Sequence, residues 1–238
     1  EPRIEAKHRH GIELDATPAQ RAEARRIAAE SGISLCCVAT SRVYANPETN
    51  KENIELTRRC IDLAADVGSP RIRVFGGQFP AQLDRASAIS LVADSLAQVA
   101  EYAADRGVTL CVETHDAWCD PLHLAEVMKR VNHPNVAINW DIMHPIFRGN
   151  KSMEEAFEIV KPWVRHCHIH DGVMRDGKLE LVWIGTGAID HKKAMECLKG
   201  LNYQPYLSGE WINRQPPYTE HLPKELETLK RYEKELAG

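Results

Sequence analysis

Residues Val108–Asp116, with the sequence VTLCVETHD, combine a buried strand with a short run of polar and charged side chains. In an extended chain the apolar Val108, Leu110 and Val112 share one face, while the opposite face ends at Glu113. This pattern suits a strand of a parallel barrel, because helices cover the outer face and the site lies where the strands end. We therefore interpret the stretch as a barrel strand that presents Glu113 at the mouth, although a loop charge or a helix cap would explain this carboxylate taken alone.

Six further stretches have the composition of strands, and a helical pattern follows each of the seven. The expected strands are Arg3–His8, Ile33–Ala39, Arg71–Phe75, Val108–Glu113, Val136–Asp141, Arg165–His170 and Tyr206–Glu210. The expected helices are Pro18–Ser31, Asn50–Val67, Arg85–Arg106, Pro121–Val131, Ser152–Trp163, Asp190–Leu198 and Leu222–Leu236. This alternation, in which no signal for an antiparallel hairpin stands out, favours parallel strands with right-handed crossovers.

The pattern best matches an α/β protein with a TIM (β/α)8 barrel that lacks its first βα unit in this chain, and we expect that unit to precede Glu1. An open, doubly wound sheet is the competing architecture. It would be expected to carry a glycine-rich phosphate turn after its first strand, and the sequence has none there. No shift in composition marks a boundary, so we expect a single domain over residues 1–238.

The composition, with 43% hydrophobic and 27% charged residues, is that of an ordinary globular protein. The net charge of −4 does not favour nucleic acid as a partner, and no apolar run approaches the length of a membrane span. The seven cysteines include no CxxC pair. We expect them to be reduced packing residues, which indicates a cytoplasmic protein.

Three other expected strands also direct a titratable side chain inward near their C-terminal ends: Asp141, His168 and Glu210. Glu113 and Asp141 are 28 residues apart, and Asp141 and His168 are 27 apart, about one βα unit each. Taken singly, each has a structural explanation, such as a helix cap, a buried hydrogen-bonded histidine or a loop charge. Taken together, converging carboxylates would repel one another unless a cation neutralised them.

We therefore expect one divalent metal ion at Glu113, Asp141, His168 and Glu210. Three carboxylates and one imidazole make an oxygen-rich site, which favours Mn²⁺ or Mg²⁺, with Mn²⁺ as our first choice. Co²⁺ and Zn²⁺ stay open as alternatives. A separate inward side chain, Arg73 on Arg71–Phe75, would contact a substrate hydroxyl, carboxylate or phosphate, or else form a structural ion pair inside the barrel.

The strings VETHD, NWDIMHP, HCHIHDG, GTGAID and SGEW follow one another along the chain. In this combination and order they resemble the xylose isomerase-like TIM barrels, the sugar phosphate isomerase and epimerase group related to endonuclease IV. The resemblance implies the same four metal ligands, and it implies substrate or supporting roles for His115 and His144. It departs from the family pattern at His170, where many relatives carry lysine, so the substrate contact of this residue is open.

The resulting prediction is a metal-dependent isomerase or epimerase that acts on a small polyhydroxy carbonyl compound through an enediolate, with Glu113 and Glu210 as catalytic groups. The alternative is a dehydratase of a keto-cyclitol, similar to the inosose and dehydroshikimate dehydratases of the family. An abasic-site endonuclease would need more His and Asp ligands and a basic groove. A barrel repurposed for binding alone would be expected to have lost at least one of the four metal-ligating residues, and all four are present. The expected partner is a sugar or polyol, and the sequence leaves a homo-oligomer open.

Overall fold

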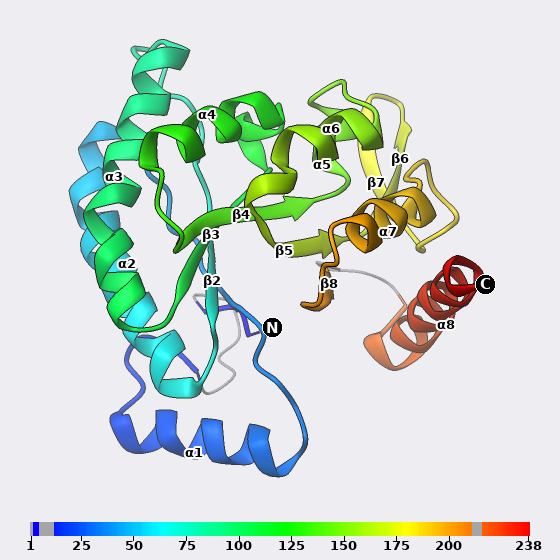
Figure 1. Ribbon diagram of the computed structural model, residues 1–238, viewed down its shortest axis with the longest axis horizontal. Helices are drawn as coiled ribbons and strands as arrows, with labels where there is room; N and C mark the ends of the chain where they lie inside the picture. The colour runs from blue at the N-terminus through cyan, green and yellow to red at the C-terminus, as the bar shows by residue number, and fades with distance from the viewer. Residues whose placement is uncertain (1, 5–11, 211–215) are drawn as a thin grey trace.

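The computed structural model describes residues 2–4, 12–210 and 216–238. Within these residues six parallel strands form one sheet in the order β1-β2-β3-β4-β5-β8. Figure 1 shows the strands along an arc with helices on its outer side, which is a half-barrel. The strands are β1 (Val38–Ala39), β2 (Arg71–Val74), β3 (Thr109–Glu113), β4 (Val136–Asp141), β5 (Val164–Ile169) and β8 (Leu207–Gly209).

The helices follow the strands as the sequence predicts, and local capping explains where several of them begin. Thr17 and Gln20 form a capping box at the start of α1, and Ser152 and Glu155 form another at α6. The helices are α1 (Pro18–Glu30), α2 (Pro47–Val67), α3 (Arg85–Asp105), α4 (Pro121–Val131), α5 (His144–Phe147), α6 (Met153–Val160), α7 (His191–Gly200) and α8 (Tyr218–Ala237), with 3-10 turns at Asp116–Trp118 and Lys161–Trp163. Among the residues described, each helix is too short or too polar to cross a lipid bilayer.

The strand register decides which side chains share a level inside the half-barrel. Cα partners across neighbouring strands include Glu113 with Asn139 and Asp141 with His168. Trp140, on the opposite parity, faces outward and packs its ring against Phe157 of α6, with ring centroids 5.1 Å apart. The alternation predicted for these strands therefore places apolar side chains under the helices and polar ones inside.

The segment that follows β5 differs from the sequence-based prediction. Residues Asp171–Arg175 (β6) and Lys178–Val182 (β7) form an antiparallel hairpin, whereas the prediction from the sequence contains only parallel strands. Asp176 and Gly177 both have positive φ, as a two-residue hairpin turn of the primed type requires. This hairpin makes a small sheet of its own and adds no barrel strand.

The strand expected at Ile33–Ala39 is paired only over β1, because its first half runs along the surface and leaves Ile33 61% exposed. The first expected strand, Arg3–His8, is represented by a parallel bridge from Arg3 to Ala39. Residues 5–8 of that strand lie outside the described residues.

Candidate metal centre

The ends of four strands bring the predicted metal ligands together. Glu113 is the last residue of β3, Asp141 the last of β4, His168 lies near the end of β5, and Glu210 directly follows β8. One oxygen or nitrogen atom from each of the four lies within 4.8 Å of the others. Glu113 and Asp141 are fully buried, and the Glu210 side chain is 19% exposed, so the cluster sits at the mouth of the half-barrel rather than on its surface.

Asp141 is fixed by backbone hydrogen bonds on both sides. Its amide donates to Thr114 Oγ1 at 2.9 Å, and that hydroxyl donates to the Asp141 carbonyl at 3.0 Å, which joins the ends of β3 and β4. Its Oδ1 accepts from the amides of Met143 at 2.8 Å and His144 at 3.2 Å, where the chain turns into α5. The carboxylate is thus oriented by the fold, with Oδ2 left to face other side chains.

His168 and Arg73 connect the two glutamates, of which Glu113 ends the interior strand β3 and Glu210 follows the edge strand β8. His168 Nδ1 lies 3.0 Å from Glu113 Oε1 and 3.6 Å from Glu210 Oε2. Arg73 Nε lies 3.2 Å from Glu113 Oε2, and its Nη2 lies 3.9 Å from Glu210 Oε1. Arg73 is 1% exposed, donates to the carbonyl of Thr40 at 2.9 Å and stacks on Phe75. Its side chain is therefore engaged in ion pairs inside the barrel.

The surroundings hold two of the acids in their charged form. Burial raises the pKa of Asp141, but the charges of His170 and His144 and the hydrogen bond from His170 outweigh it and leave the pKa well below its usual range. Burial also raises the pKa of Glu210, whereas the hydrogen bond and charge of His168, together with Arg73, bring it down to about 2. Both acids are therefore deprotonated at neutral pH, as metal ligands must be.

We expect the metal-free protein to lose stability as the pH falls from 4.5 towards about 2. A carboxyl group whose pKa is lower in the folded chain stabilises the fold above its unfolded pKa, and this stabilisation disappears as the pH drops through the folded value. Urea unfolding of chelator-treated protein at graded pH measures the effect. The native chain should show a steeper loss than Glu210→Gln, which lacks one of these groups, and equal slopes would contradict the assignment.

Three histidines surround the mouth of this cluster. The imidazoles of His115 and His144 have centroids 4.2 Å apart, and those of His144 and His170 are 5.4 Å apart. Burial lowers the pKa of His115, but its hydrogen bond to Asp116 and the charge of Glu113 raise it overall. For His170, Asp141 likewise outweighs burial and raises the pKa, whereas burial keeps the pKa of His144 low. The structure thus places His115, His144 and His170 in a row, with His144 and His170 beside Asp141.

The donor set fits a divalent cation on charge as well as on geometry. Three carboxylates converge here, and Arg73 offsets one of their charges, which leaves two negative charges for a cation to neutralise if the imidazoles are neutral. Glu113 Oε2 is buried and has no hydrogen-bond partner among the described residues, although Arg73 Nε lies 3.2 Å away as an ion-pair partner. This buried carboxylate oxygen can therefore accept a further cation beside its ion pair with Arg73.

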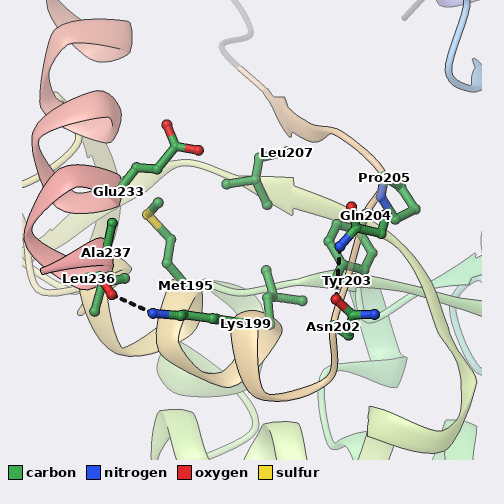
Figure 2. Close-up of a pocket in the computed structure, with 11 residues that line it drawn as sticks. Met195, Lys199, Asn202, Tyr203, Gln204, Pro205, Leu207, Glu233, Leu236 and Ala237 are labelled. Carbon is green, nitrogen blue, oxygen red and sulfur yellow. Dashed lines mark hydrogen bonds between the residues drawn. The ribbon is translucent and has the colours of Figure 1, made fainter.

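A pocket of about 460 Å³ lies elsewhere, between α7, β8 and α8 (Figure 2). Lys199 on its wall donates to the Leu236 carbonyl, and Gln204 donates to Asn202 at 2.9 Å. None of the four predicted ligands lines it. The cluster of predicted ligands and this pocket are therefore separate places on the protein.

The chain matches the family model of the xylose isomerase-like TIM barrel over residues 1–232. It belongs to the xylose isomerase-like TIM barrel family. An uncharacterized protein, MJ1311, of Methanocaldococcus jannaschii is 26% identical over 175 residues, which cover 69% of this chain and 58% of that protein. A 3-dehydroshikimate dehydratase of Bacillus anthracis is 26% identical over 120 residues, which cover 50% of this chain and 42% of that enzyme. The chain thus spans about half the length of these curated relatives.

Solved structures of the xylose isomerase-like family share the fold. A xylose isomerase domain protein from Planctomyces limnophilus superposes with a TM-score of 0.80 at 24% identity, covering 99% of this chain and 89% of that one. A D-tagatose 3-epimerase-like protein superposes with a TM-score of 0.76 at 21% identity, and the match covers 92% of this chain and 84% of that one. A xylose isomerase-like TIM barrel protein from Mycobacterium smegmatis was solved in complex with magnesium. It superposes with a TM-score of 0.72 at 16% identity, and the match covers 92% of this chain and 79% of that one. These likenesses confirm the predicted barrel architecture.

Sequence reasoning missed two residues that shape this xylose isomerase-like site. Thr114 has the outward parity of its strand end, so nothing in the local pattern indicated that its hydroxyl would join β3 to β4. Asp171 accepts one backbone hydrogen bond from Gly172 beside it and three from the segment that follows the hairpin. Its position directly after His170 in HCHIHDG was the available signal, but a single aspartate there does not reveal its partners.

Proposed function

We propose that this protein is a metal-dependent isomerase or epimerase of a small polyhydroxy carbonyl compound, in the class of sugars. One observation carries the proposal: Glu113 and Glu210, from β3 and from the end of β8, approach the same His168 nitrogen at 3.0 and 3.6 Å. Two carboxylates that reach a common point from different strands can address two sides of one substrate. Isomerisation and epimerisation both require a base on one side and an acid to return the proton.

Glu113, Asp141, His168 and Glu210 would hold the cation, and we propose Mn²⁺, with Mg²⁺, Co²⁺ and Zn²⁺ as alternatives. The oxygen-rich donor set supports this choice. When bound, such an ion polarises a carbonyl and makes the neighbouring C–H more acidic.

The chain's own residues divide the remaining work. We assign proton removal and return to Glu113 and Glu210, because they are the carboxylates with approaches from different strands. His115, His144 and His170 present ring nitrogens near the mouth, where substrate hydroxyls would be oriented. We assign Arg73 to holding the two glutamates, since its guanidinium faces both carboxylates and is 1% exposed.

A dehydratase of a keto-cyclitol is the second candidate, and the relative named 3-dehydroshikimate dehydratase favours it. Its first step would be the same proton removal, after which the enolate expels a hydroxyl group from the β carbon as water. The two reactions therefore need the same ligands and the same base. They differ in that the dehydratase must also protonate the leaving hydroxyl group.

Incubation with ketoses and with keto-cyclitols, followed by mass spectrometry, tests the proposal. We expect Mn²⁺-loaded protein to convert a ketose into a product of equal mass and different retention. A product lighter by one water from a keto-cyclitol would establish the dehydratase instead. Absence of turnover with either class, in protein shown to contain the metal, would overturn both candidates.

A further inference from the structure

Another cavity lies at the end of the half-barrel where the strands begin, opposite to the metal cluster. Arg71 is the first residue of β2 and Tyr206 directly precedes β8, whereas the predicted metal ligands lie at the strand ends. The cavity has a volume of about 390 Å³, which is within the range of small-molecule sites. We call it the basal pocket. Its walls come from α1, the segment before β1, the end of α2, the start of β2 and Tyr206.

The basal pocket is positively charged. The charged residues among those that line it are Arg25 and Arg71, and no aspartate or glutamate is one of them. On α1 the neighbouring Arg21 and Arg26 each pair with an acid, whereas Arg25 has no ion pair or hydrogen bond within the part of the chain that the structure describes. Arg71 makes one long contact, 3.4 Å from its Nη1 to the carbonyl of Cys36. Two guanidinium groups at one cavity repel each other, and an anion between them would offset that repulsion.

The backbone holds both arginines at this place. Arg71 and Arg73 are two residues apart on β2, so Arg71 shares the inward face of Arg73, while Ile72 between them is fully buried on the other face. The side chain of Arg25 lies across Gly68, which has a φ of 81° at the end of α2. A Cβ at Gly68 would lie 3.3 Å from Arg25 Nε, so glycine lets the guanidinium approach the chain closely.

The remaining walls of the basal pocket are apolar and open to solvent. Ile33 is 61% exposed and Tyr206 is 56% exposed, and Val67 and Pro70 continue the apolar surface between α2 and β2. A large exposed aliphatic side chain and an exposed aromatic ring at the rim of one cavity can cover an apolar ring of a ligand. The pocket therefore combines a surface for such a ring with two donors for an anionic group.

We propose that the basal pocket binds a phosphate monoester whose alcohol part carries an apolar ring. Such a phosphate has a charge of about −1.5 to −2 at neutral pH, which matches the two guanidinium groups. Arginine presents paired N–H donors that fit the oxygens of a phosphate. The inference is independent of the proposed isomerase activity, because the basal pocket and the metal cluster have no residue in common.

Calorimetric titration of the metal-loaded full chain with phenyl phosphate tests the proposal. We expect the native chain to bind phenyl phosphate more tightly than inorganic phosphate, which lacks the ring, or phenol, which lacks the charge. Arg25→Gln and Arg71→Gln should each weaken binding about tenfold, since a hydrogen bond between charged groups is worth about that factor. Tyr206→Ser should reduce the preference for phenyl phosphate over inorganic phosphate.

Arg130→Gln is the matched control, because it removes the same charge from α4, outside the basal pocket. It should bind phenyl phosphate as the native chain does. Circular dichroism checks the fold of each variant, and Arg25→Gln on the exposed face of α1 decides the test if Arg71→Gln does not fold. No binding of phenyl phosphate to the native chain would overturn the proposal. Unchanged affinity in Arg25→Gln would also overturn it, because the ligand would then bind elsewhere, for example at the metal cluster.

Discussion

Glu113→Gln and Glu210→Gln are each expected to abolish turnover while much of the bound metal is retained. An amide oxygen still coordinates a cation weakly, but it neither accepts nor returns a proton at neutral pH. Proton transfer by a positioned side chain contributes about 10²–10⁴-fold to a rate, so each variant should lose at least that factor in kcat. His144→Ala should keep part of the activity, because we assign His144 to orienting oxygen atoms.

Parallel kinetics, elemental analysis and solvent isotope incorporation measure this result. Glu126→Gln is the matched control, since within the described part of the chain Glu126 pairs only with Arg130, on the exposed face of α4. In deuterated solvent the native protein should place deuterium at the reacting carbon, because the proton on the glutamate exchanges with solvent. Product without solvent label, together with activity in either glutamine variant, would favour a hydride shift or an external base.

Asp171→Ala is expected to destabilise the protein by about 2–4 kcal/mol, since hydrogen bonds to a charged group are worth about 1.5–3 kcal/mol each and are not additive. The buried carboxylate accepts from the amides of Gly172 at 2.8 Å, Gly185 at 2.9 Å, Gly187 at 2.9 Å and Ile189 at 3.1 Å. Two of these amides, at Gly172 and Ile189, are buried, so removing their acceptor leaves them unsatisfied.

The loss should extend to the metal centre. The segment that Asp171 organises leads to His191, whose Nε2 lies 3.1 Å from the carbonyl of His170. Urea unfolding of the chelated protein measures the stability, and elemental analysis measures retained metal. Gly187→Ala should act in the same direction, because a Cβ there would lie 2.2 Å from Asp171 Oδ1.

Asp176→Asn serves as the control for the Asp171 variants. It lies at the exposed hairpin turn with a φ of 50°, a conformation that asparagine also tolerates. Its free energy of unfolding should stay within about 0.5 kcal/mol of the native chain, as for most surface substitutions. If the free energy of unfolding of Asp171→Ala also stayed within about 0.5 kcal/mol of the native value, the four amides would have found other acceptors.

The amino-acid sequence by itself determined the helices and the inward side chains. Helix starts depend on neighbouring residues, such as the Thr17–Gln20 capping box, and are therefore readable from the local pattern. Strand parity has a period of two residues, so the positions of Glu113, Asp141 and His168 on their strands could be predicted to face one interior. The hairpin could also have been predicted, because Asp176-Gly177 is a recognised turn pair between two apolar runs.

Only the tertiary structure decided which of these side chains touch. The contact between Arg73 and Glu113 joins β2 to β3, and the contact between Asp141 and His170 joins the ends of β4 and β5. Both depend on how far each strand is offset from the next, and the register shifts between Ile138 and Asn139, where β4 meets β5. Parity is a local property of an extended chain, whereas offset is set by packing between strands and helices distant in sequence. That is why the cluster of predicted ligands could be expected from the pattern, while the distances between them, their charge partners and the grouping of His144 with His170 required the fold.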